Sequence, residues 1–169
     1  MPCRNRLEFG AKTYMSGNES RAGATGANNH GEGFYTLEDQ AGFLLRRANQ
    51  RHTEIFQNLF GKSGLTALQF SALVKIRDEG RVSQNQLGRL THMDPATIMG
   101  VINRLTKRGL IRRGSDSTDK RKTVLMLTAD ALQLIESLES TAHQVTARTL
   151  EPLSPGEQKT LLRLLSRLT

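Results

Sequence analysis

Residues 82–108 constrain the fold most, because capping residues divide them into two helices joined by a tight turn. Ser83 is followed three residues later by Gln86, a capping-box pattern that predicts the start of a short helix. After a three-residue turn, Asp94 and Pro95 supply an N-cap and a first-turn proline for a second helix. Two helices at this spacing predict a helix-turn-helix.

A β-hairpin is predicted directly after the second helix. Gly109 is placed to end that helix in a left-handed conformation. Two aliphatic and β-branched segments, residues 110–113 and 123–127, then flank a loop rich in Gly, Ser and Asp. A hairpin in this place is a wing. We therefore expect a mainly α fold with a small β-hairpin wing, that is, a winged helix-turn-helix.

Positive charge is concentrated in the same segment. Residues 81–122 contain ten Lys and Arg but three Asp, a net charge of +7, whereas the whole chain has a net charge of +8. The sequence pI of about 10.2 favours a polyanionic partner, either a nucleic acid or an anionic membrane surface. Because the charge coincides with a helix-turn-helix, we expect double-stranded DNA. The alternative is a basic helix that faces water without a ligand.

The chain divides into a tail and one domain. Residues 1–34 contain six of the 15 glycines and little apolar periodicity, so we expect a flexible N-terminal tail that buries too little apolar surface to fold. Residues 35–169 form the predicted domain. Within it we expect a DNA-binding core at about residues 64–128 and dimerisation helices at about residues 36–60 and 129–168.

The terminal helices carry more apolar surface than one small domain needs. We place the N-cap of the first helix at Thr36 and its end near Gly61. The last helix begins at another capping box, Ser154 with Glu157, and its leucines spread over more than one face. These features predict a homodimer, with dimerisation helices contributed from both termini of the domain.

The second helix of the helix-turn-helix has an apolar face and a polar face. The residues expected to pack on the preceding helix are Ile98, Ile102 and Leu105. On the opposite stripe, small residues let the backbone approach base edges in the major groove, where Thr97, Asn103 and Arg104 can form hydrogen bonds. We place Ala96 and Asn103 at the margins of this stripe. The predicted DNA contacts on both helices are Ser83, Gln84, Gln86, Pro95, Ala96, Thr97, Gly100, Val101, Asn103, Arg104 and Lys107.

The wing tip carries three consecutive cations, Lys120, Arg121 and Lys122. An arginine at a hairpin tip fits a narrow A·T minor groove, where the negative potential is enhanced. We therefore include Lys120 and Arg121 among the predicted DNA contacts. Asp119 is a poor neighbour for a phosphate, and we expect it to accept hydrogen bonds from a nearby arginine and so stiffen the wing.

Three short motifs together resemble the MarR (multiple antibiotic resistance regulator) family. The pair Asp119-x-Arg121, followed by residues 123–128, is similar to that family's D-x-R wing motif. The others are Leu65-Thr66-x-x-Gln69-Phe70-x-x-Leu73 and Leu105-x-x-Arg108-Gly109-Leu110-Ile111. The resemblance covers about residues 36–168. It implies a dimeric regulator, in most such proteins a repressor, with two recognition helices on a pseudo-palindromic operator, and a small ligand that weakens DNA binding.

The resemblance also implies a ligand pocket between the dimerisation helices and the winged domain. His52 falls on the apolar stripe of the first helix, beside Arg51 and one turn after Arg47. A buried imidazole flanked by arginines would suit a carboxylate, such as an aromatic acid or its thioester conjugate. The alternative is that His52 is a core or interface histidine bonded to backbone.

Other sensing chemistries fit the sequence poorly. Some proteins of that family sense oxidants through a cysteine in the first helix, but the single cysteine here, Cys3, falls in the expected tail. The histidines at positions 30, 52, 92 and 143 show no metal-ligand spacing, so we expect no metal site and no cofactor.

Other function classes lack a supporting motif. We find no G-x-S-x-G, phosphate loop or H-E-x-x-H, and we expect no enzyme. No apolar run approaches the roughly 18 residues needed to span a bilayer, and no signal-peptide h-region opens the chain, which predicts a cytoplasmic protein. The remaining alternative is a sequence-neutral architectural DNA-binding protein without an effector, for which a basic wing and tail suffice.

Overall fold

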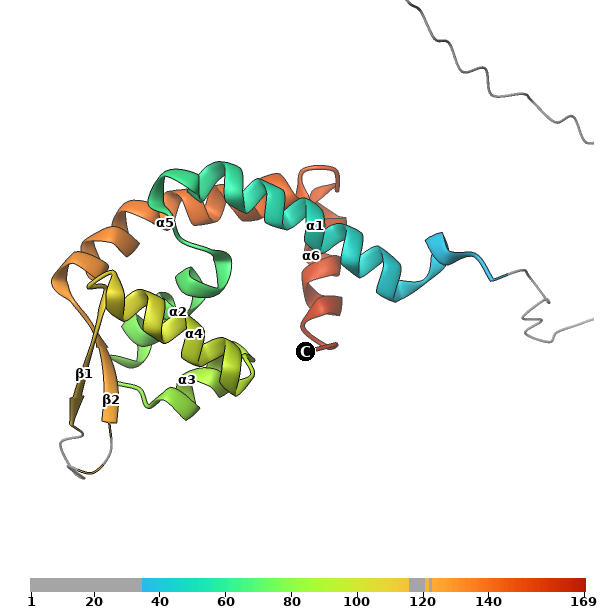
Figure 1. Ribbon diagram of the computed structural model, residues 1–169. Helices are drawn as coiled ribbons and strands as arrows, with labels where there is room; N and C mark the ends of the chain where they lie inside the picture. Colours follow the sequence, from blue (N-terminus) through green and yellow to red (C-terminus); the bar gives the residue numbers. More distant parts are fainter. Residues whose placement is uncertain (1–34, 116–120, 122) are drawn as a thin grey trace, which may run out of the picture. The chain divides into compact units, whose positions relative to one another are not determined.

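The computed structural model describes residues 35–115, 121 and 123–169, of which Thr36–Thr169 form one compact unit. The predicted tail with Cys3, and the wing-tip residues Asp119, Lys120 and Lys122, lie outside the described residues. The elements in chain order (Figure 1) are η1 Leu37–Asp39, α1 Ala41–Phe60, η2 Gly61–Ser63, α2 Ala67–Glu79, α3 Gln84–Thr91, α4 Pro95–Lys107, β1 Ile111–Ser115, β2 Thr123–Leu127, α5 Ala129–Leu150 and α6 Pro155–Leu165.

Most of the predicted helix starts are confirmed by their caps. The backbone N–H of Thr66 donates to Gln69 Oε1 at 3.0 Å, and the Gln69 N–H donates to Thr66 Oγ1 at 3.3 Å, a complete capping box. The Thr128 side chain caps α5. The Glu157 carboxylate accepts from both the N–H and the hydroxyl of Ser154. These bonds satisfy N–H groups that have no partner within the helix.

The first helix starts later than predicted, at Ala41 rather than directly after Thr36. A short 3-10 helix, Leu37–Asp39, comes before it. Gln40 closes this turn, because its backbone N–H donates to the Leu37 carbonyl and its side chain donates to the Thr36 carbonyl at 2.9 Å. Since the Gln40 backbone is itself extended (φ −82°, ψ 131°), the α-helix begins beyond it.

Only one of the two hydrogen bonds of the predicted capping box forms at the start of α3. The Ser83 hydroxyl accepts from the backbone N–H of Gln86 at 3.3 Å. The Gln86 side chain does not return this bond but donates to Glu79 Oε2 at 3.3 Å. A complete capping box would need Gln86 Oε1 to accept from the Ser83 N–H, whereas this side chain directs its amide group toward the Glu79 carboxylate.

The winged part has one apolar core. Its fully buried side chains come from α2, α3, α4 and α5 and include Leu73, Ile76, Leu87, Ile102, Leu105 and Ile135. The two strands pair antiparallel from Ile111↔Leu127 to Ser115↔Thr123. Val82 adds a bridge, exchanging backbone hydrogen bonds with Leu125 at 2.8 and 3.2 Å. The bridge holds the hairpin beside the start of α3.

A second apolar cluster joins the long helices to the winged part. α1 and α5 lie side by side (Figure 1) and bury Phe56, Phe60 and Val145 between them. The rings of Phe56 and Phe60 stack with centroids 4.1 Å apart, and Phe70 of α2 meets Phe60 edge-on at 4.9 Å. The C-terminal end of α1 is therefore locked onto α2.

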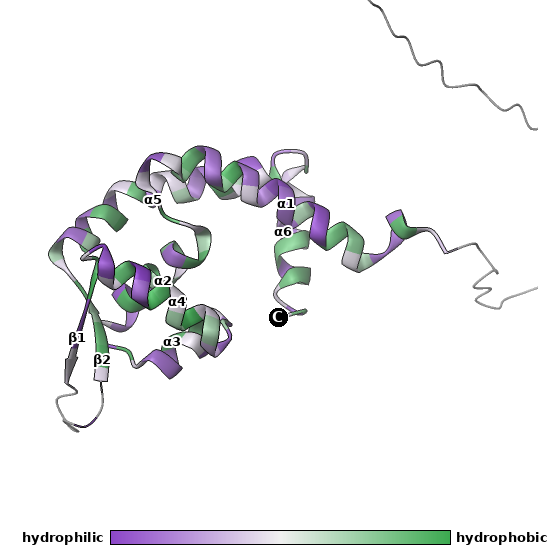
Figure 2. Ribbon diagram, in the orientation of Figure 1, coloured by the Kyte–Doolittle hydropathy of each residue, from purple (hydrophilic) through white to green (hydrophobic). Residues whose placement is uncertain are grey.

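By contrast, the residues that the structure describes leave α6 and the first half of α1 largely uncovered. α6 has no buried residue, although apolar residues make up much of it (Figure 2). Leu162 is 51% exposed and Leu168 is 75% exposed. On α1, Leu44 and Leu45 are 50% and 49% exposed.

Candidate nucleic-acid interface

The N-terminus of α4 is held by one carboxylate. Asp94 Oδ1 accepts from the backbone N–H groups of Ala96 at 3.0 Å and Thr97 at 2.9 Å, and the Thr97 hydroxyl donates to Oδ2. The bond from the Thr97 hydroxyl, followed by the backbone bonds, holds the pKa of Asp94 below its ordinary value. We predicted that the Thr97 hydroxyl donates to or accepts from DNA; its proton is used within the protein, which leaves Oγ1 as an acceptor.

The exposed face of α4 differs from the predicted one by a rotation about the helix axis. Val101 is 3% exposed and packs in the core with Ile98, so the prediction that Val101 contacts DNA is wrong. A helix turns about 100° per residue, and this places Ala96 and Asn103 near the centre of the outward face rather than at its margins. Four aliphatic side chains, not three, anchor α4.

Met99 is a surface residue of α4 that the sequence reading missed. Its side chain is 50% exposed, beside Ala96 and Asn103 at spacings of three and four residues. The signal was present, because three- and four-residue spacing defines a helix face. The sequence prediction nevertheless placed Met99 on neither face of the helix. On a reading helix, an exposed thioether can instead contact a thymine methyl.

Cations cover the C-terminal half of the same face. Arg104 and Lys107 are exposed, and neither forms an ion pair with any of the described residues. The Arg104 guanidinium lies over Gly100, where an added Cβ would be 3.2 Å from Nη2. Gly100 thus leaves room for the arginine to lie along the helix. Two uncompensated cations beside small residues suit a polyanion.

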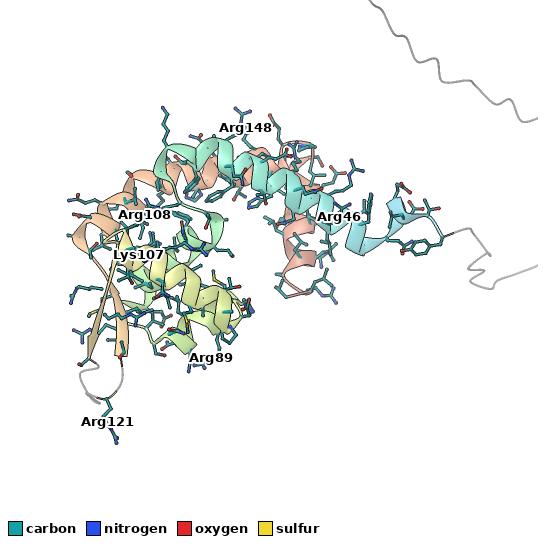
Figure 3. All side chains as sticks on the ribbon, in the orientation of Figure 1. Arg46, Arg89, Lys107, Arg108, Arg121 and Arg148 are labelled. Atoms are coloured by element: carbon teal, nitrogen blue, oxygen red, sulfur yellow. The ribbon has the colours of Figure 1, made fainter. Side chains whose placement is uncertain are left out.

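The wing contacts this face through Asn103. Arg113 of β1 donates from Nη2 to Asn103 Oδ1 at 3.4 Å. β1 is largely hydrophilic and β2 hydrophobic (Figure 2), which leaves Arg112 and Arg113 exposed while Val124 and Leu125 face the core. Asp119, which we expected to accept hydrogen bonds from Arg121 or from one of Arg112 and Arg113, lies outside the described residues. Arg121 is exposed at the far end of the hairpin (Figure 3).

The start of α3 borders α4 across a hollow of about 580 Å³. The hollow is lined by polar residues of α3, among them Gln84, Asn85 and Arg89, and by Pro95 of α4. Ser83 and Gln86 are partly buried and bonded within the protein. Among the α3 residues that line the hollow, Asn85 and Arg89 are exposed, and we did not predict either as a contact.

The three predicted ligand residues do not meet in one hollow. His52 lines a hollow of about 340 Å³ between α1, α5 and α6. Arg51 lines another, of about 370 Å³, and its Nη2 donates to the Arg148 carbonyl at 3.0 Å. The guanidinium of Arg47 is exposed and lies 5.8 Å from the Phe43 ring centroid. Neighbours on a helix point in different directions, which explains the separation.

His52 is bonded to a side chain, not to backbone. Its Nδ1 lies 3.1 Å from Thr149 Oγ1, and that hydroxyl donates to the Val145 carbonyl at 2.8 Å. Because the hydroxyl proton is used, Oγ1 accepts from Nδ1–H, which assigns the tautomer. Nε2 is then the ring nitrogen that remains for a ligand.

The described residues carry no features of two other site types. No helix among them is long and apolar enough to cross a bilayer. The same residues bring together no group of three or more His, Cys, Asp or Glu side chains that would hold a metal ion.

Several known proteins are similar to this chain in sequence or in structure. The HTH-type transcriptional repressor NicR of Pseudomonas putida is 37% identical over 134 residues, which cover 79% of this chain and 85% of NicR. A probable transcriptional regulator from Pseudomonas aeruginosa is 48% identical with a TM-score of 0.75, covering 79% of this chain and 100% of that one. Bordetella bronchiseptica BpsR, whose DNA binding is regulated by 6-hydroxynicotinic acid, is 40% identical with a TM-score of 0.77 and coverages of 80% and 97%.

The exposed cationic helix, the wing and these likenesses define a DNA-binding transcriptional regulator of the winged helix-turn-helix class. Residues 65–123 match the family model described as MarR family. With the similarity to NicR over most of both proteins, this shows that the chain belongs to the MarR family.

Proposed function

We propose that this chain is a homodimeric repressor that places two α4 helices on a pseudo-palindromic operator. The observation that most supports it is the outward face of α4, where Asn103, Arg104 and Lys107 lie beside Arg113 of the wing. A second copy supplies a second face, and twofold symmetry of the protein suits the same symmetry in the DNA. The proposed contacts are Ser83, Gln84, Gln86, Pro95, Ala96, Thr97, Met99, Gly100, Asn103, Arg104, Lys107, Arg113, Lys120 and Arg121.

The test compares two labelled DNA duplexes by fluorescence anisotropy. One, the upstream duplex, is the DNA directly upstream of the chain's own coding sequence; the other, the scrambled duplex, has the same composition in random order. The proposal requires binding to the upstream duplex to be tighter by about a thousandfold or more. Equal affinities would overturn it and support the sequence-neutral architectural alternative.

The dimer is supported by the apolar surface that the chain leaves uncovered. The exposed leucines lie on η1, the first half of α1, α6 and the turn that follows α6, namely Leu37, Leu44, Leu45, Leu162, Leu164 and Leu168. Contiguous apolar surface of this kind is covered in soluble proteins by a partner. A second copy of the same chain covers it with matching leucines.

The proposed effector is an aromatic carboxylate that binds beside His52. The hollow at His52 has leucine and alanine walls that suit an aromatic ring, including Leu45, Ala48 and Leu150. The Nε2 atom of His52 supplies a polar contact for the carboxylate when the ring is protonated. BpsR, at 40% identity, responds to a compound of this class, 6-hydroxynicotinic acid.

The effector test uses 6-hydroxynicotinic acid as the probe. The acid is expected to raise the midpoint of thermal unfolding and to weaken binding to the upstream duplex. His52→Ala removes both effects, whereas His143→Ala, a change of the exposed histidine of α5, keeps them. Identical responses of the two variants would remove His52 from the site.

A further inference from the structure

Arg108 ends the recognition helix but turns away from its outward face. Its Nη1 donates to the Gly64 carbonyl and its Nη2 to the Ser63 carbonyl, both at 2.8 Å. The neighbouring Lys107 is exposed on the outward face (Figure 3). Although both belong to the basic segment, the two cations have different surroundings.

The segment that Arg108 grips is the junction between α1 and α2. The Ser63 hydroxyl donates to the Phe60 carbonyl at 2.7 Å and accepts from the Leu65 N–H at 3.2 Å. Gly64 adopts a left-handed conformation (φ 64°, ψ 17°) that aims its carbonyl at the arginine. Phe60, fully buried, anchors the junction to α1. The junction therefore moves with the end of α1.

The geometry of the contact requires a guanidinium. Two terminal nitrogens in one plane donate to two successive carbonyls, which a single ammonium cannot do in the same way. The contact also spans 44 and 45 residues of sequence, joining the end of α4 to the junction that directly follows α1, the helix with the exposed Leu44 and Leu45. It is a direct polar connection between these two regions.

We infer that Arg108 is a positioning residue that couples α1 to the recognition helix α4. A shift of α1, imposed by the partner or by an effector, pulls the junction and with it the C-terminal end of α4. The inference rests on the proposed DNA interface, since α4 must read DNA for its position to matter. Arg108 acts through α4 and does not itself neutralise a phosphate.

Three variants distinguish an effect of Arg108 on the position of α4 from an effect of its charge on DNA binding. Arg108→Lys keeps the charge and loses the paired contact, Arg108→Gln loses both, and Lys107→Gln removes a cation of the outward face. Both Arg108 variants are expected to bind the upstream duplex about 2- to 30-fold more weakly, with an unchanged slope of log affinity against log salt. Because both protomers of the proposed dimer carry the change, Lys107→Gln is expected to reduce that slope by about 1.8, that is, about 0.9 for each lost phosphate contact. Thermal unfolding checks that every variant is folded.

Amide hydrogen exchange at the junction provides a second measurement, which a loss of charge alone would not change. In the wild type, binding of the upstream duplex is expected to slow amide exchange at residues 61–66, which touch no DNA in the proposed interface. In both Arg108 variants this slowing is lost, while slowing within α4 remains. Wild-type affinity and wild-type slowing in Arg108→Lys would overturn the inference, as would a salt slope reduced by Arg108→Gln. Failure of the proposed function is separate, because the wild type would then bind both duplexes equally.

Discussion

Asn103 is the side chain at which α4 and the wing meet. Its Oδ1 accepts from Arg113, so the amide NH₂ group is left to donate outward. In the major groove, the acceptors that such a donor meets are O6 and N7 of guanine, N7 of adenine and O4 of thymine. The wing thus orients a donor of the reading helix before DNA binds.

Asn103→Ala is expected to weaken binding to the upstream duplex by about 1–3 kcal/mol, with a smaller loss on the scrambled duplex. Fluorescence anisotropy on both duplexes measures the difference. Asn58→Ala, which changes an exposed asparagine of α1, is the matched control and leaves both affinities unchanged. Equal losses on the two duplexes would instead make Asn103 a contact of the DNA backbone.

Asp94 makes the start of α4 sensitive to acid. Because hydrogen bonds lower its folded-state pKa below the unfolded-state value, its contribution to stability is present above the unfolded-state pKa. That contribution is lost as the pH falls through the folded-state pKa. Thr97→Val removes the hydroxyl hydrogen bond, which is the largest cause of the lowered pKa. The pKa of Asp94 is therefore expected to rise, and the variant is expected to lose less stability on acidification.

NMR titration of the side-chain carboxyl carbons checks the Asp94 prediction, together with urea unfolding at a series of acid pH values. The pKa of Glu157 is the internal control, since bonds from Ser154 lower it and Thr97 does not touch it. An Asp94 pKa that is the same in Thr97→Val and in the wild type would show that the hydroxyl bond does not matter in solution.

At the scale of the elements, the C-terminal end of α4 determines where the chain continues into the wing. Gly109 has φ +68°, a left-handed conformation, and its N–H donates to the Thr106 carbonyl at 2.9 Å. The next N–H, of Leu110, donates back to the Leu105 carbonyl at 3.0 Å. This reversal directs the chain into β1 and so places the wing beside the recognition helix.

Gly109→Ala is expected to lower the free energy of unfolding by about 1–2 kcal/mol, because a side chain disfavours the left-handed conformation. An added Cβ at this position meets nothing within 4 Å, so crowding does not contribute. Gly156→Ala on α6 has equal space and no positive φ, and is expected to stabilise by about 0.4–1 kcal/mol. Urea unfolding at one fixed protomer concentration compares them; equal effects would contradict the backbone explanation.

At the scale of the whole molecule, the exposed leucines of α1 and α6 form the proposed interface between the two protomers. The chain buries Phe56 and Phe60 at one end of α1 but leaves Leu44 and Leu45 of the same helix exposed. In the proposed homodimer, the second copy completes the apolar packing and at the same time sets the separation of the two α4 helices. Stability and DNA binding are therefore linked to protomer concentration.

Replacing both Leu162 and Leu168 by Glu is expected to give a monomer with at least about tenfold weaker binding to the upstream duplex, because one half-site contact is lost. Sedimentation velocity measures the oligomeric state and anisotropy the affinity. Leu132→Glu, on α5 and 42% exposed, is the control and stays dimeric. A dimer that persists in the double variant would exclude this face of α6 as the interface.

Local signals made much of the fold predictable. The caps at Thr66, Asp94 and Thr128, and the left-handed Gly109, each depend on residues within a few positions, so short motifs report them directly. The error at Thr36 has the same local origin, since Gln40 satisfies the groups that a longer helix would have used. The family resemblance rested on these local motifs as well, and the comparisons confirmed it.

Orientation and long-range partners were not available from such patterns. Val101 and Met99 are both apolar, and the packing of α4 on α3 decides which of them is buried. Arg51 and His52 are adjacent in sequence, yet they line different hollows, one between α1 and the end of α5 and the other between α1, α5 and α6. Arg108 looked like one cation among many until its partners, more than 40 residues away, were in place. Capping and periodicity are local properties of a chain, whereas the direction of a side chain and its distant partners follow from packing.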